Sequence, residues 1–127
     1  VFPVIELHHH VMRGQPPSAG ELIAHNAIHA GFVAGSGIGT EAPLGEPSLT
    51  IHAEGRLLDE CAGTALIDTI HSSLKWLMEI MQTWDEQLAA GQIVLTGSIP
   101  SLIPVTEDGI IRVDAPPFGG VEVKFIA

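Results

Sequence analysis

Glu6 and His8 have the residue types and the spacing that a metal site on a strand requires. Residues 3–11 alternate between apolar and polar side chains, which predicts a half-buried strand with residues two apart on one face. A carboxylate and an imidazole placed in this way can both reach one ion. His10 is on the same face but another repeat away, too far to join easily. A solvent-exposed strand edge without a ligand is the alternative, and the spacing leaves both open.

A second candidate site follows the apolar residues 93–95, which read as a buried strand. Thr96, Gly97 and Ser98 come directly after it and predict a turn. The end of a strand is a place where polar groups can be held still and presented to a ligand. A plain strand followed by a plain turn is the alternative interpretation of these residues.

The other chemically active residue types are scattered along the chain. We expect four histidines to lie at the surface or to be satisfied by a partner: His25, His29, His52 and His71. Cys61 has no basic residue within three positions, which predicts a packing role rather than a reactive thiolate. A single cysteine excludes an intrachain disulfide and fits a reducing compartment.

The composition favours one acidic domain over residues 1–127. The chain is 46% hydrophobic, with a mean hydropathy of +0.34, which is enough apolar material for a core. Five basic and fifteen acidic residues give a formal net charge of -10, which disfavours nucleic acid and anionic membrane surfaces as partners. No apolar stretch approaches the roughly 18 residues that cross a bilayer, and no basic segment precedes an apolar block at the start. We therefore expect a soluble, cytoplasmic protein.

The elements that must position the candidate residues predict a strand-rich α+β fold. Ser18 and Glu21 match a capping box that opens a short helix, and apolar residues at helical spacing predict one long helix that is large enough to cover a sheet. Glu54 and Gly55 predict the turn of a hairpin. The expected helices are 19–29 and 64–90, and the expected strands are 3–11, 31–35, 49–53, 56–61, 92–97, 110–114 and 120–126.

Six segments, in chain order, form a recognisable pattern: PVIEL at 3–7, NAIHAGFV at 26–33, the hairpin that ends with GT at 63–64, SLKWL at 73–77, GQIVLTGS at 91–98 and FGGVEVKF at 118–125. In this order they resemble the 2-keto-4-pentenoate hydratase and 4-oxalocrotonate decarboxylase branch of the fumarylacetoacetate hydrolase superfamily. The match extends over nearly the whole chain. The resemblance implies a mixed β-roll or sandwich, incomplete here, with one long covering helix and one short helix.

The resemblance also implies a function for both candidate sites. In this family a divalent ion, usually Mg²⁺ or Mn²⁺, is held by three carboxylates and binds a 2-keto acid, which is hydrated or decarboxylated. Glu6 is similar to the third carboxylate. Thr96 and Gly97 are similar to the pair that contacts the substrate at the end of the strand, and Ser98 is a weaker neighbour.

The departures from the family pattern matter equally. The two other carboxylates form a Glu-x-Glu pair in the family, and this pair lies upstream of the resembling segment, as does the general-base lysine; none of these is in this chain. The chain thus resembles the C-terminal half of such an enzyme, and we expect it to be weakly active or inactive alone. His8 or His9 stands where an acidic residue often follows the ligand strand.

Three functions stay open on these grounds. The chain contributes Glu6 and the turn at Thr96 and Gly97 to a composite hydratase or decarboxylase site, or it is a non-catalytic module for binding a small acid or for oligomerisation. In a third, weaker reading, His8 or His10 joins Glu6 to bind Zn²⁺. Half a scaffold exposes apolar surface, so we expect a homo-oligomer or a complementing N-terminal half.

Overall fold

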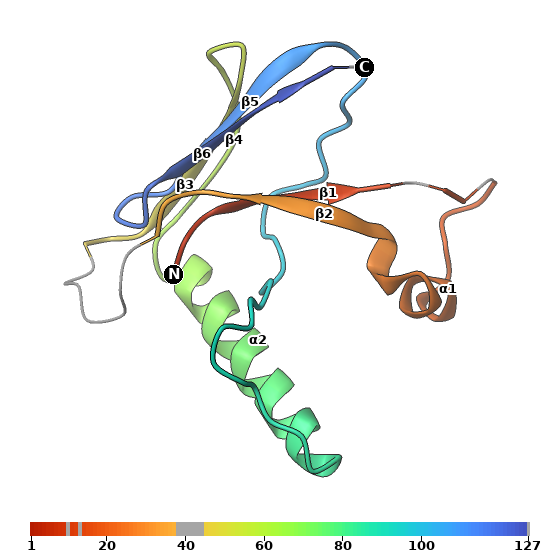
Figure 1. The fold of residues 1–127 in the computed structure, drawn as a ribbon. Coiled ribbons are helices and arrows are strands. Elements are labelled where there is room, and N and C mark those ends of the chain that lie inside the picture. Colours follow the sequence, from red (N-terminus) through yellow and green to blue (C-terminus); the bar gives the residue numbers. More distant parts are fainter. Residues whose placement is uncertain (10, 13, 38–44, 127) are drawn as a thin grey trace.

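Two separate antiparallel sheets form the body of the protein (Figure 1). The structure is a computed structural model that describes residues 1–9, 11, 12, 14–37 and 45–126; His10 of the predicted polar face lies outside them. One sheet is a two-stranded hairpin and the other has four strands in the order β4-β3-β5-β6. The strands are β1 (Val4–His8), β2 (His29–Ala34), β3 (Ser48–Ala53), β4 (Arg56–Ala62), β5 (Gly109–Asp114) and β6 (Gly120–Phe125).

The four-stranded sheet confirms the strands that its sequence predicts. Glu54 and Gly55 have positive φ angles of 48° and 75° and form the tight turn between β3 and β4. The Glu54 carboxylate accepts a hydrogen bond from the Ile110 N–H at 2.6 Å, which ties this turn to β5. Strands and helices in one chain agree with the α+β class, and the described sheets form no closed barrel.

The core is small and lies on one face of the four-stranded sheet. Ile51, Val113 and Val121 are buried together. Ile5 and Val33 of the β1–β2 hairpin pack against this cluster. The hairpin approaches the four-stranded sheet closely at Gly35, directly after β2, where an added Cβ would collide with the Gly120 carbonyl. This contact seats the hairpin on β6.

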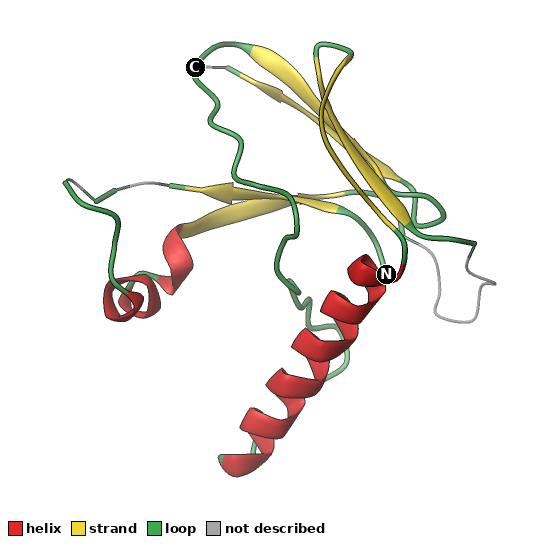
Figure 2. Cartoon of the chain, turned by 180° about the vertical axis from the view of Figure 1, so that it is seen from behind, coloured by secondary structure: helices red, strands yellow, loops and turns green. Residues whose placement is uncertain are grey.

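The long helix α2 (Thr64–Thr83) is shorter than predicted and does not cover a sheet. It extends away from both sheets, and the chain after it returns alongside (Figures 1 and 2). The expected end at Ala90 is wrong, because Asp85 takes a left-handed φ of 58° that no helix can continue. Trp84 at the C-cap is 75% exposed, so no packing holds a further turn.

The short helix α1 (Ala19–Ala24) has the predicted capping box. The Ser18 N–H donates to the Glu21 carboxylate at 2.8 Å, and the Glu21 N–H donates to the Ser18 hydroxyl at 3.4 Å. The expected helix to residue 29 is interrupted after His25, because the 3-10 turn η1 (Asn26–Ile28) has positive φ angles at all three residues. None of the helices formed by the described residues is both long and apolar enough to span a bilayer.

The predicted strand over residues 92–97 is wrong: this segment is not part of either sheet. No backbone–backbone hydrogen bond joins residues 93–97 to another described residue. A strand needs a neighbouring backbone to pair with, and residues 93–97 pair with none in the described part of the chain. The segment packs on α2 instead, where the Ser73 hydroxyl donates to the Thr96 carbonyl at 2.9 Å.

Candidate functional site

Glu6 lies between two histidines on the β1–β2 hairpin. The His29 Nδ1 is 2.7 Å from Oε1 of Glu6, and the His8 Nε2 is 3.7 Å from Oε2. An ionised carboxylate only accepts hydrogen bonds, so the His29 Nδ1–H is the donor. The three side chains are between 25% and 29% exposed, so water still reaches them. One oxygen of Glu6 is therefore held in a short hydrogen bond, and the other is left nearer to His8.

A shift in strand pairing brings His29 to Glu6. The first part of the β1–β2 pairing is regular, but His8 then pairs with His29 rather than with Ala30. Because successive residues of a strand alternate between faces, regular pairing would send His29 to the opposite face. The bulge thus adds a second histidine to the face that already carries Glu6 and His8.

A cavity of about 1030 Å³ opens beside Glu6. Its lining is mostly apolar and comes from β1, β3, β5, the first half of α2 and the segment that follows residue 91. Among the described lining residues, Glu6 is the one Asp, Glu, Lys or Arg. His8 also lines the cavity and His29 does not, so His29 contacts Glu6 from outside it. The negative charge of the site is therefore concentrated at one carboxylate.

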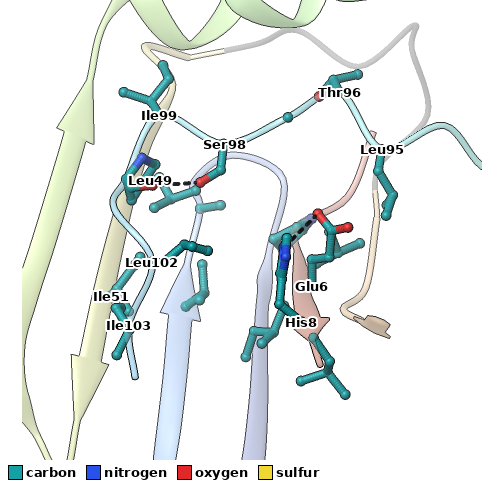
Figure 3. Close-up of a pocket in the computed structure, with 18 of the residues that line it drawn as sticks. Glu6, His8, Leu49, Ile51, Leu95, Thr96, Ser98, Ile99, Leu102 and Ile103 are labelled. Carbon is teal, nitrogen blue, oxygen red and sulfur yellow. Dashed lines mark hydrogen bonds and ion pairs between the residues drawn. The ribbon is translucent and has the colours of Figure 1, made fainter. Parts of the chain in front are cut away.

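Thr96, Gly97 and Ser98 line the same cavity (Figure 3). Gly97 has a φ of 89°, which favours glycine, and an added Cβ would meet no described residue within 4 Å, so the turn needs glycine for its backbone rather than for space. The Ser98 hydroxyl donates to the Pro100 carbonyl at 3.0 Å. No bond joins the Thr96 hydroxyl to another described residue, which leaves it able to bind a ligand.

The donors around Glu6 supply only part of a metal shell. No group of three or more His, Cys, Asp and Glu side chains in the described part of the chain is arranged to hold a metal ion. The 2.7 Å between Glu6 and His29 is a hydrogen bond, and it is shorter than the ~3 Å that separates two ligands of one ion. Glu6 Oε2 and His8 Nε2 are far enough apart for an ion to lie between them. Structural zinc takes four ligands, and Mg²⁺ takes one or two carboxylates with waters and substrate oxygens.

The predicted site residues share one cavity, but the sequence did not associate His29 with them. Glu6 and His8 come from β1, whereas Thr96 and Gly97 come from an irregular segment about 90 residues later. His29 is satisfied by a partner, as expected, and that partner is Glu6. An interior glycine in a strand, here Gly31, is the one sequence signal of the bulge that joins them.

Two curated proteins are similar to this chain over most of its length. A 2-keto-4-pentenoate hydratase of Paraburkholderia phymatum is 29% identical over 107 residues, which are 83% of this chain and 41% of that protein. A 2-oxo-hept-4-ene-1,7-dioate hydratase of Escherichia coli is 25% identical over 114 residues, which are 88% of this chain and 43% of that protein. The chain thus spans about two fifths of the length of these relatives. No family model and no solved structure matches it.

Proposed function

We propose that this chain forms part of a hydratase- or decarboxylase-like protein of the fumarylacetoacetate hydrolase superfamily, and that it binds a 2-keto or 2-hydroxydienoic acid. The observation that carries the proposal is the single cavity lined by both Glu6 and the turn at Thr96, Gly97 and Ser98. An ionic end and a polar turn in an otherwise apolar cavity suit a small acid with an apolar tail. Both curated relatives are hydratases by name.

In this proposal Glu6 binds a divalent ion, Mg²⁺ or Mn²⁺, and shares its shell with the acid. One carboxylate is compatible with such an ion only when substrate oxygens and further groups complete the shell, so the fit is partial. When bound, the ion supplies Lewis-acid polarisation of the keto group. The residues of this chain have simpler roles: the Thr96 hydroxyl and the Gly97 N–H bind the acid's carboxylate, and the apolar lining packs against the rest of the acid.

The proposal includes a partner that completes the site, either a complementing polypeptide or a second copy of this chain. Residues 93–96 have β-forming side chains, and their backbone has no strand partner among the described residues, so they can accept a strand from another chain. The cavity is at the upper limit for small-molecule sites, so a five-carbon acid would leave most of it empty. Ile93 is 52% exposed and Leu102 is 74% exposed at its rim.

A non-catalytic module for binding a small acid, or for oligomerisation, is the second candidate. The observation that favours it is the incomplete donor set, since no group of three or more His, Cys, Asp and Glu side chains in the described residues is arranged to hold a metal ion. A variant of the proposal uses the pair of Glu6 and His8 for Zn²⁺, because an imidazole is a good zinc ligand. The proposal needs Mg²⁺ or Mn²⁺, the non-catalytic module needs no ion, and the variant needs Zn²⁺.

A thermal-shift experiment separates the candidates. We expect Mg²⁺ or Mn²⁺ together with pyruvate, or with oxalate as an enolate mimic, to raise the melting temperature, and Glu6→Ala to abolish the shift. Pyruvate that raises the melting temperature equally without an ion supports the non-catalytic module. A shift that only Zn²⁺ produces, and that His8→Ala removes, supports the zinc variant. If no ion or acid shifts the melting temperature, the proposal is wrong for the isolated chain.

The partner is tested by sedimentation. We expect the chain to associate, with itself or with a complementing fragment, and Val94→Pro to weaken that association because proline has no N–H for a ladder. A stable monomer at high concentration, unchanged by the complementing fragment, would contradict the partner part of the proposal.

A further inference from the structure

His29 is fixed in place on three sides. It pairs with His8 across the β1–β2 bulge, which sets its backbone. Its ring lies beside Phe32, with centroids 6.5 Å apart and a tilt of 37°. Its Nδ1 donates to Oε1 of Glu6 at 2.7 Å, a distance typical of a hydrogen bond to a charged acceptor. A side chain held in this way can serve as a rigid support for the carboxylate.

We infer that His29 is a positioning residue for Glu6, which orients the carboxylate so that Oε2 alone is presented to an ion and its acid in the cavity. Three observations carry the inference. His29 contacts Oε1 and not Oε2, it lies outside the cavity lining, and the remaining oxygen is the one that lies 3.7 Å from His8. The inference rests on the proposed function, because it assigns the ion to one oxygen of Glu6.

A single-carboxylate site depends on such support more than a site with three carboxylates does. A glutamate side chain has several rotatable bonds, so an unsupported Glu6 would have to be ordered each time an ion binds. Hydrogen bonds from outside the shell keep a ligating carboxylate in one orientation, and their loss typically weakens binding by about 10- to 100-fold. His29 makes the one short bond of this kind to Glu6 among the described residues.

The test measures Mn²⁺ affinity in the presence of oxalate, from the electron paramagnetic resonance signal of the free ion. We expect His29→Ala to weaken binding by about tenfold or more. His29→Asn should stay within about threefold of the unchanged protein, because the asparagine Nδ2 can replace the histidine Nδ1 as donor. His71→Ala is the matched control, since His71 is an exposed histidine of α2 outside the cavity lining, and it should change nothing.

A second measurement does not need an ion. The carboxyl carbon signal of Glu6 in the metal-free protein should move in His29→Ala and return toward its original position in His29→Asn. The melting temperature of each variant shows whether the fold persists. A structural defect alone would lower the melting temperature of both variants and would not be reversed by the asparagine donor.

The outcomes separate the inference from the proposed function. Equal Mn²⁺ affinity in His29→Ala and the unchanged protein overturns the inference, as does an asparagine variant as weak as the alanine variant. If the unchanged protein binds no Mn²⁺ with oxalate, the proposed function fails for the isolated chain. In that case the NMR measurement decides the inference. If His29→Ala leaves the Glu6 carboxyl carbon signal unchanged, the inference is overturned as well. If His29→Ala moves the signal and His29→Asn restores it, His29 is still the residue that orients Glu6.

Discussion

Gly35→Ala should separate the hairpin that carries Glu6 from the four-stranded sheet. A Cβ at this position would meet the Gly120 carbonyl oxygen well inside contact distance, its carbonyl carbon at 3.0 Å and the Val121 Cβ at 3.1 Å. Gly35 does not have a positive φ, so alanine brings no backbone strain of its own. Its N–H also donates to the Pro3 carbonyl at 2.9 Å, which holds the end of the hairpin in place. The added methyl group therefore acts through its volume alone.

The expected loss follows from what the methyl group meets. Overpacking typically costs about 1 to 3 kcal/mol of unfolding free energy. We expect about 2 to 3 kcal/mol, near the upper end, because the obstacle is backbone rather than the end of a flexible side chain. Gly120 is paired with Asp114 on β5 and cannot rotate away without breaking the ladder. With a urea m-value of about 1.5 to 2 kcal/mol/M, the midpoint should fall by roughly 1 to 2 M.

Urea unfolding followed by circular dichroism measures this loss. Gly45→Ala is the control, because no described residue lies within 4 Å of its added Cβ and its φ is not positive. It should change the unfolding free energy by less than about 0.5 kcal/mol. If Gly35→Ala unfolds within about 0.5 kcal/mol of the control, the close approach of the hairpin to β6 is refuted. The packing on β6 of the hairpin that carries Glu6 would then be refuted as well.

Two further substitutions test the core and one charged pair. Val113→Ala should lower the unfolding free energy by about 2 kcal/mol, because it removes two methyl groups from a side chain that is 5% exposed. The control Leu57→Ala, at a residue that is 49% exposed, should lower the free energy of urea unfolding much less. Equal losses in the two variants would contradict the core assignment. Hydrogen bonds from Arg112 hold the pKa of Asp114 below its ordinary value of 3.8. Because the folded pKa is the lower one, Asp114 stabilises the fold above its unfolded pKa and loses this contribution as the pH falls through the folded pKa. Arg112→Gln should raise the pKa of Asp114 in a carboxyl-carbon NMR titration and remove this acid sensitivity below about pH 4, and an unchanged titration would refute the pairing.

Much of the fold could be predicted from local signals. Period-two alternation located β1 and β6, the Glu54 and Gly55 turn located the β3–β4 hairpin, and Ser18 with Glu21 located the start of α1. Each of these signals acts between residues that are close in sequence. The prediction therefore needed no knowledge of what lies across the molecule.

The predictions of secondary structure were wrong where tertiary contacts decide whether a strand or helix forms. Residues 93–95 have the composition of a buried strand, yet they pair with no backbone among the described residues and form no strand. The turns beyond Thr83 have helical periodicity, but Trp84 is exposed and Asp85 takes a left-handed φ, so the helix ends before them. Local propensity is weak beside packing, so both segments lost the structure that their sequence favours.

The sequence by itself determined the candidate residues: Glu6 and His8 on one face of a strand, and a polar turn at Thr96 and Gly97. It could do so because side-chain type and strand periodicity are local properties. Only the tertiary structure decided that both sets line one cavity and that His29 holds Oε1 of Glu6. The reason is that a one-residue bulge reverses the face of His29, and the register of a strand pair depends on contacts between distant parts of the chain.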